Sequence, residues 1–301
     1  MTDTIPLNLD KNSREIVSYP DPLFPLEIWT GNFYEGVETG LPPHWHPEFE
    51  YGVVIKGHII YTFPEYVIEL GPGDCIFVNS DRMHYIKQRL EAAPAEMYTV
   101  AFLPSLLSAN EQSPIFQKYF SGESDMDFTA LQIKKDGSAG ETIHRLLPKI
   151  YESRSMPYGF ELQALSLVSR LWLETLRYLK DADLMPYLHA TDASARETAA
   201  IKRALSFLYA HYDEKLTVED IADAAYISRN SCFRYFRNCF GKTPLEMLNE
   251  HRLSVAASLL SGDKPITEIA FSCGFGSSSY FARMFRAKYG VTPQEYRLSK
   301  T

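Results

Sequence analysis

The chain has 301 residues, of which 45% are hydrophobic and 23% are charged, and its formal net charge is −8. This length allows two domains of ordinary size, and these fractions are typical of a globular protein rather than of a membrane or disordered chain. No apolar run approaches the length of a membrane span, and residues 1–20 lack a basic start followed by an apolar stretch, so we expect a cytoplasmic protein without a signal peptide or membrane partner.

The charges are unevenly distributed along the chain. Residues 196–301 hold 15 Lys and Arg against 11 Asp and Glu, a net charge of +4, which leaves 15 against 27, a net charge of −12, in residues 1–195. An acidic N-terminal part and a basic C-terminal part favour a regulator with separate sensing and nucleic-acid-binding parts. The four cysteines form no CxxC pair and are expected to be small core residues in a reducing compartment: Cys75, Cys232, Cys239 and Cys273.

The first part of the chain, residues 27–102, predicts short strands separated by turns. Glycines interrupt several runs that are rich in β-branched and aromatic residues: Glu50–Ile55, His58–Phe63, Cys75–Val78 and Met97–Phe102. Short strands at this spacing are typical of an all-β barrel or sandwich. We therefore expect an N-terminal β-barrel.

Helical periodicity begins after Pro104. Apolar residues recur at intervals of three and four in one stripe: Leu162, Leu165, Val168, Leu171, Trp172, Thr175, Leu176 and Leu179. A second amphipathic stretch covers residues 141–151, where Pro148 can kink or end the helix. The leucine stripe either pairs two subunits into a homodimer or packs against the barrel of its own subunit.

A linker is predicted at residues 181–195, which contain a proline, three aspartates and few aliphatic residues. It separates an N-terminal domain, residues 1–180, from an all-helical C-terminal domain, residues 196–301. In the latter, residues 199–212 are expected to be helical, and Thr217 is an N-cap with Asp220 three residues on.

A degenerate repeat marks the C-terminal domain. The first unit carries Ile221-Ala222, Arg234-x-Phe236-Arg237, Gly241 and Thr243-Pro244, and the second carries Ile269-Ala270, Arg283-x-Phe285-Arg286, Gly290 and Thr292-Pro293. An apolar helix, a tight turn and a second helix with basic and aromatic faces indicate a helix-turn-helix in each unit, at about 217–240 and 266–289. Two such units in one chain favour a protein that reads two segments of DNA.

The second helix of each unit is the candidate reading helix. The first is expected to begin after Ser228 and to end at Gly241, and it presents Arg229, Asn230, Phe233, Arg234 and Arg237. The second presents Ser278, Ser279, Ala282, Arg283 and Arg286. Arg can bond guanine and Asn adenine, Phe or Ala can touch a thymine methyl, and the later arginines suit phosphate. Such faces also occur on ordinary solvated helices, but the same pattern in both units favours promoter DNA.

A helix from Pro244 to about Leu260 is predicted to join the two units. Its length of roughly 24 Å suits two reading helices held near one DNA turn apart, about 34 Å, in successive major grooves.

The C-terminal motifs resemble the AraC/XylS family of bacterial transcription regulators. The resemblance lies in Arg234-x-Phe236-Arg237, Arg252-Leu253, and the run from Gly274-Phe275 through Ser279-Tyr280-Phe281-x-Arg283-x-Phe285-Arg286 to Tyr296-Arg297. It covers about 100 residues and implies a DNA-binding regulator in which Asn230, Phe233, Arg234, Ser278, Ser279, Ala282 and Arg283 face bases. Because the first unit presents more side chains that can form hydrogen bonds with bases, we expect it to discriminate between bases more strongly than the second.

Histidines in the predicted barrel form a second motif. His44-x-His46-x3-Glu50, with a later His84, resembles the metal-binding motif of cupin barrels. Residues i and i+2 of a strand point to the same face, as shared coordination requires. The resemblance implies a Zn, Ni, Fe or Mn site; the alternatives are that these four side chains contact an effector directly or only fill the barrel.

Three aromatic residues near this motif, Trp45, Tyr51 and Tyr61, are candidate contacts for a small-molecule effector, and aromatic faces beside polar groups suit a carbohydrate. We therefore expect a ligand-responsive transcription regulator and not an enzyme. The alternative, a metal-dependent cupin enzyme, leaves the C-terminal repeat unexplained and offers no separate general acid or base.

Overall fold

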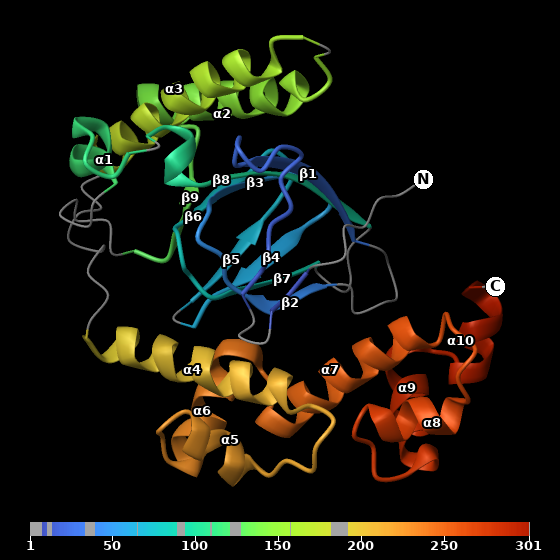
Figure 1. Ribbon diagram of the computed structural model, residues 1–301. Helices are drawn as coiled ribbons and strands as arrows, with labels where there is room; N and C mark the ends of the chain where they lie inside the picture. The colour runs from blue at the N-terminus through green and yellow to red at the C-terminus, as the bar shows by residue number, and fades with distance from the viewer. Residues whose placement is uncertain are drawn as a thin grey trace.

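The computed structural model describes residues 8–10, 14–33, 40–64, 66–88, 94–108, 110–120, 128–156, 158–181 and 192–300. A β-rich N-terminal domain lies above an all-helical C-terminal domain (Figure 1). This is the α+β, two-part architecture predicted from the sequence. In the described residues no helix is both long and apolar enough to cross a membrane.

The N-terminal domain contains two antiparallel sheets. Its strands are β1 (Leu26–Phe33), β2 (Gly40–His44), β3 (Phe49–Lys56), β4 (Ile59–Thr62), β5 (Val67–Leu70), β6 (Cys75–Val78), β7 (His84–Gln88), β8 (Ala95–Phe102) and β9 (Ala130–Ile133). One sheet has the order β1-β8-β3-β6-β9 and the other β2-β7-β4-β5. The described strands therefore form the sandwich variant of the all-β domain predicted from the sequence rather than a closed barrel, because no ladder joins the edge strands of one sheet to those of the other.

Strand β3 shows how the sequence builds two apolar layers. Val54 belongs to the core between the sheets, whereas Phe49, Tyr51 and Val53 pack on the opposite face, beneath the helices. Alternate residues of a strand point to opposite faces, so a central strand covered on both sides is apolar almost throughout. The five-stranded sheet is accordingly buried on both faces.

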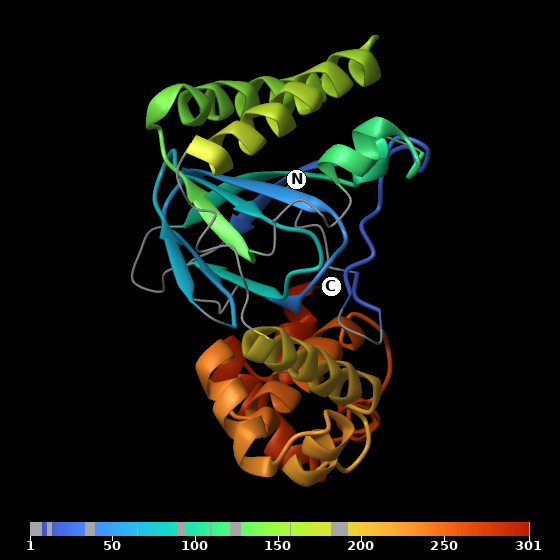
Figure 2. The same cartoon turned by 90° about the vertical axis from the view of Figure 1, so that its left-hand side faces the viewer.

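A helical layer covers the outer face of the five-stranded sheet (Figure 2). It consists of α2 (Gly137–Ser153) and α3 (Phe160–Asp181), with the short helices η1 (Pro104–Leu106) and α1 (Pro114–Tyr119) nearby. Val168, Leu171 and Trp172 of the leucine stripe are buried in the core beneath α3. The stripe thus packs largely within its own subunit, and Pro148 does not end α2.

The C-terminal domain contains seven helices in the described residues: α4 (Asp192–Ala210), α5 (Val218–Ala224), α6 (Arg229–Phe240), α7 (Pro244–Leu259), α8 (Ile266–Ser272), α9 (Ser278–Tyr289) and α10 (Pro293–Lys300). Helix α7 runs between a first unit, α5 and α6, and a second unit, α8 and α9 (Figure 1).

Local signals set the helix boundaries in this domain. Thr217 and Thr243 form complete capping boxes, Ser228 caps α6, and Gly241 ends it in the left-handed conformation. The linker prediction was too long at both ends, since Asp181 belongs to α3 and residues 192–195 to α4; residues 182–191 lie outside the described residues. Two alanines in the stretch 192–195 favour the helix there.

The four cysteines are buried and form no disulfide bond, as predicted for core residues: Cys75, Cys232, Cys239 and Cys273.

Candidate functional site

Three histidines meet inside the N-terminal sandwich. His44 at the end of β2 lies directly across the sheet from His84 at the start of β7, and His46 follows two residues later. The ring centroids are 4.1 Å apart for His44 and His84 and 5.1 Å apart for His46 and His84. One nitrogen from each ring lies within 4.8 Å of the others, and all three side chains are buried.

Backbone carbonyls orient the three rings. Each Nδ1 bonds to a carbonyl oxygen two residues away, at 2.7 Å for His44, 3.2 Å for His46 and 2.9 Å for His84. Because a carbonyl oxygen only accepts, each Nδ1 carries a proton and each Nε2 points into the cluster, where that of His46 is bonded to Glu50. This is the arrangement that orients histidines around a metal ion.

Glu50 of β3 completes the cluster. Its Oε2 lies 3.0 Å from His46 Nε2 and 3.6 Å from His84 Nε2, and its Oε1 accepts a hydrogen bond of 2.9 Å from the Tyr61 hydroxyl. Burial by itself would raise the pKa of Glu50, but the hydrogen bond of His46 and the charges of the two histidines hold it well below its ordinary value. Burial also opposes the charge on His46, yet the neighbouring carboxylates raise its pKa to about 9.

The residues present fit a divalent transition metal. His84 Nε2 is buried and has no hydrogen-bond partner, which is a costly state for a polar atom unless a ligand satisfies it. Three imidazole nitrogens and one carboxylate form a donor set that suits Zn, Ni, Fe or Mn. The cluster therefore has both the donors and an unsatisfied nitrogen for such an ion.

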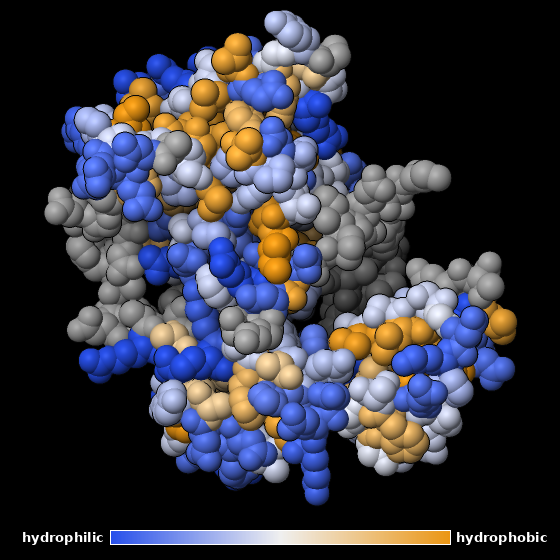
Figure 3. Space-filling view, viewed as in Figure 1, coloured by the Kyte–Doolittle hydropathy of each residue, from blue (hydrophilic) through white to orange (hydrophobic). Residues whose placement is uncertain are grey.

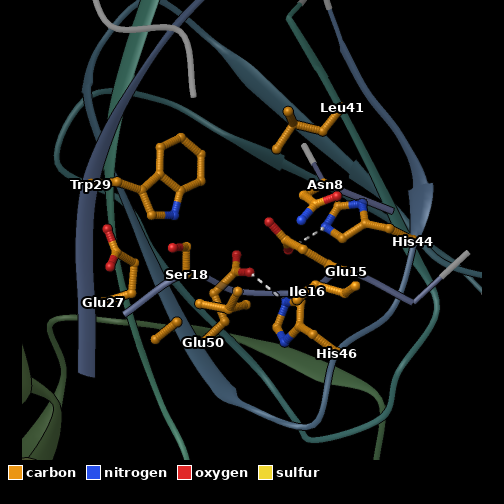
Figure 4. Close-up of a pocket in the computed structure, with 12 residues that line it drawn as sticks. Asn8, Glu15, Ile16, Ser18, Glu27, Trp29, Leu41, His44, His46 and Glu50 are labelled. Carbon is orange, nitrogen blue, oxygen red and sulfur yellow. Dashed lines mark hydrogen bonds and ion pairs between the residues drawn. The ribbon is translucent and has the colours of Figure 1, made fainter. Parts of the chain in front are cut away.

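A pocket of about 200 Å³ opens beside the cluster (Figure 4). It is lined by Asn8, Glu15, Ile16, Val17, Ser18, Glu27, Trp29, Leu41, His44, His46, Glu50 and Ala101. The lining contains three carboxylates and neither Lys nor Arg. Burial and the neighbouring carboxylates raise the pKa of Glu15 to about 7, and burial raises that of Glu27. The pocket thus favours a ligand that donates hydrogen bonds over one that carries negative charge.

None of the three aromatic residues predicted to contact an effector lines this pocket. The Tyr61 ring lies in the core between the sheets and reaches Glu50 only through its hydroxyl. Tyr51 points to the opposite face of β3, where its hydroxyl bonds Thr175 at 2.7 Å. Trp45 points toward the C-terminal domain, because its neighbours in sequence, His44 and His46, point inward.

Most of the pocket residues that the sequence did not indicate come from β1 and the N-terminal segment, and Leu41 and Ala101 come from β2 and β8. Trp29 and Glu27 face the histidines from across the pocket, and Glu15 lies 3.7 Å from His44 (Figure 4). No regular spacing relates these residues to the histidine motif, so only the folded chain brings them together.

The loops that carry the histidines also contact α4. The Lys202 ammonium lies 4.1 Å from the centre of the Trp45 ring and donates a 2.6 Å hydrogen bond to the Asp81 carbonyl. The Asp81 amide in turn donates to the His46 carbonyl at 2.8 Å. Met83, one residue before His84, is buried in the core of the first helix-turn-helix unit. One layer of backbone therefore separates the histidine cluster from the C-terminal domain.

The candidate DNA-binding side chains form two sets on α6 and α9. On α6, Arg229, Asn230, Arg234 and Arg237 are exposed and Phe233 is partly buried. On α9, Ser279, Arg283 and Arg286 are exposed, and Ser278 and Ala282 are partly exposed. The apolar stripes face inward, with Phe236 and Phe285 fully buried. Arg229 forms an exposed ion pair with Glu219 at 2.7 Å, and Arg283 lies 5.3 Å from the Tyr280 ring.

Comparisons with known proteins agree with this two-part construction. Residues 221–299 match the family model "Helix-turn-helix domain", and residues 34–101 match "Cupin domain". The HTH-type transcriptional regulator YdeC of Bacillus subtilis (strain 168) is 23% identical over 96% of this chain and 97% of its own. The HTH-type transcriptional activator RhaS of Citrobacter koseri is 25% identical over 86% of this chain and 88% of its own.

Solved structures of similar chains include ToxT from Vibrio cholerae O395, which is 15% identical with a TM-score of 0.43 and covers 92% of this chain and 98% of its own. The DNA-binding domain of AdpA in complex with a target DNA is 33% identical over 34% of this chain and 91% of its own, with a TM-score of 0.32. The helix-turn-helix and cupin matches define a transcription regulator with an N-terminal small-molecule-binding domain. The chain thus combines an AraC-type helix-turn-helix domain with a cupin domain, as the motifs in its sequence predicted.

Proposed function

We propose that α6 and α9 read two segments of promoter DNA and that a small molecule in the histidine pocket alters this reading. The observation that carries the proposal is that both helices present an exposed arginine at the same position of the repeat, Arg234 and Arg283, above a buried aromatic stripe. Arginine at a reading position can make two hydrogen bonds to guanine. The two sets contribute unequally, since α6 presents more hydrogen-bonding side chains.

Arg283→Ala tests the DNA-binding role. The probe is the duplex that the full-length protein enriches from a randomised DNA library. If Arg283 contacts a guanine edge, its loss costs about 1–3 kcal/mol on this duplex, roughly a 5- to 150-fold weaker Kd, and relaxes the preference at one base position. Arg145→Ala on α2 removes the same charge from an exposed helix of the other domain and is the matched control. An unchanged base preference in Arg283→Ala would refute the assignment.

The pocket is a sensor for a polyhydroxylated, carbohydrate-like molecule. Three carboxylates accept hydrogen bonds from hydroxyl groups, and the face of Trp29 offers an apolar platform at the wall of the pocket. A divalent metal at His44, His46, His84 and Glu50 would supply positive charge next to these carboxylates. The protein acts as a regulator rather than as an enzyme, because its relatives over nearly the whole length are transcription regulators.

The contacts with α4 are the route by which the pocket acts on DNA binding. A ligand that moves the His44–His46 loop moves Trp45, because the side chains alternate along the same stretch of backbone. Trp45 and the Asp81 carbonyl both hold Lys202 of α4, the helix that packs on α6. Packed interfaces of this kind change between discrete arrangements, so a small local shift changes the position of a helix.

The protein is a homodimer that pairs through the helical layer. Leu162 and Leu173 remain exposed on α3 after the stripe has packed inward, and Leu173 also lines a groove with Ile115, Tyr119 and Leu176. Apolar side chains gather over this layer at the top of Figure 3. An exposed apolar patch of this kind marks an interaction surface. A monomeric mass for the full chain at micromolar concentration would contradict this pairing.

A further inference from the structure

The two helix-turn-helix units touch each other at one buried arginine. Arg252 of α7 is 8% exposed, and its Nε and Nη2 donate 2.6 Å hydrogen bonds to the carbonyls of Tyr212 and Glu214. These two carbonyls belong to the connection between α4 and α5, which leads directly into the first unit. The same guanidinium lies 5.9 Å from the ring of Phe275, in the turn between α8 and α9 of the second unit. Arg252 therefore contacts both units from the helix that joins them.

Gly274 brings the backbones of the two units into direct contact beside Arg252. Its φ is +77°, which a residue with a side chain rarely adopts. A Cβ at this position would lie 2.6 Å from the Tyr212 carbonyl oxygen and 2.9 Å from Arg252 Nη2. Only glycine lets the α8–α9 turn approach the α4–α5 connection this closely.

Phe275 carries the contact onward to the second reading helix. Its ring packs 5.1 Å from that of Phe281, which lies in the first turn of α9 and is fully buried. On the other side, the partly buried ring of Tyr212 packs against the core of the first unit, which contains Phe236 of α6. A continuous set of packed residues thus runs from one reading helix to the other through Arg252.

We propose that Arg252, seated against Gly274, is the positioning residue that sets the orientation of α6 relative to α9 and hence the spacing of the two DNA segments. Helix α7 packs into both cores, with Met247 and Leu248 in that of the first unit and Leu253 and Ala256 in that of the second. Arg252 adds a directional restraint, because its planar guanidinium bonds the two carbonyls of the α4–α5 connection in fixed directions. A lysine keeps the charge but lacks this planar fork.

This inference rests on the proposed DNA-binding function, and its test is made with the full-length protein. The probes are the enriched duplex, versions with one or two base pairs inserted or deleted between the two contacted segments, and versions with either segment scrambled. One inserted base pair moves the second segment by about 3.4 Å and rotates it by about a tenth of a turn. The wild-type protein is therefore expected to bind the altered spacings at least tenfold more weakly.

Arg252→Lys and Arg252→Met are expected to differ from the wild type only in their binding to duplexes that contain both segments. Their Kd for the natural spacing rises about tenfold, their Kd values for all spacings fall within about threefold of one another, and their binding to single-segment duplexes is unchanged. A purely structural role would weaken the single-segment duplexes as well and leave the spacing preference intact. Lys264→Ala, which removes an exposed charge elsewhere in the same domain, is the control.

The spacing preference decides the outcome. If both Arg252 variants and Gly274→Ala keep the tenfold preference of the wild type for the natural spacing, the contact between Arg252 and Gly274 does not set the spacing and the inference is wrong. If Arg252→Met loses all DNA binding, the comparison is made with Arg252→Lys, which keeps the charge and most of the side-chain length. Failure of the wild-type protein to enrich any duplex would instead overturn the proposed function itself.

Discussion

The pH dependence of His251 offers a direct test of how the DNA-binding scaffold is held together. His251 lies on α7, where its ring stacks on that of Tyr209 at 4.3 Å and meets that of Tyr212 edge-on at 5.2 Å. Burial lowers its pKa to about 4, and the charges of Lys288 and Arg252 act in the same direction. The folded domain therefore holds this imidazole neutral under conditions in which the unfolded chain protonates it.

The sign and size of the effect follow from the two pKa values. Between pH 6.5 and about pH 4 the unfolded state binds the proton and the folded state does not, so the free energy of unfolding falls as the pH falls. The loss is about 2 kcal/mol at pH 5 and about 3 kcal/mol at pH 4, relative to pH 7. The stability is fully present above pH 7.

His251→Phe isolates this contribution, because it keeps an aromatic ring against Tyr209 and removes the titration. Urea unfolding of the full-length wild type and variant, followed by circular dichroism from pH 7 to pH 4, measures both free energies. Other titrating groups cancel in the difference, which is expected to shift by about 3 kcal/mol in favour of the variant at pH 4. Parallel pH profiles for the two proteins would refute the reasoning.

Two further mutations test the N-terminal domain. His84→Ala removes one of the predicted ligands and is expected to lower the Zn²⁺ content of the purified protein from about one ion per chain to below a tenth, measured by elemental analysis; the same content in both proteins would contradict the assigned site. Trp45→Ala removes the ring that faces the Lys202 ammonium, so hydrogen exchange of the α4 amides is expected to report about 1–2 kcal/mol less protection. Trp45→Phe keeps a ring and is expected to lose less; equal protection in all three proteins would show that the contact does not hold α4.

The C-terminal domain could be predicted closely from the sequence because its signals are local. The Ser228 cap, the Gly241 end of α6 and the capping box of Thr243 lie within three or four residues of the groups they bond. Helical periodicity likewise placed Phe236 and Phe285 inside and Arg234 and Arg283 outside. Each of these features depends only on residues a few positions away in the sequence. They can therefore be predicted before any tertiary contact is known.

Only part of the histidine site could be predicted from the sequence. His44, His46 and Glu50 lie close in sequence, and strand alternation explains why two of them share a face. The partners across the pocket, Glu15 and Trp29, are brought there by the packing of the N-terminal segment and β1 on the sheets. The same alternation explains why Trp45 and Tyr51 do not line the pocket, although they are close in sequence to the histidines. Their side chains point away from the pocket, to other faces of the sheets.

The sequence by itself determined the helix-turn-helix repeat, its capping residues and the histidine motif, because each rests on local hydrogen bonds or on side-chain periodicity. Only the tertiary structure decided that the sheets form an open sandwich, that the leucine stripe packs inward, and that Arg252 joins the two units at Gly274. These depend on contacts between residues far apart in the chain, such as Arg252 and Tyr212, separated by 40 positions. No spacing rule predicts such contacts, because the packing of whole elements against one another selects them.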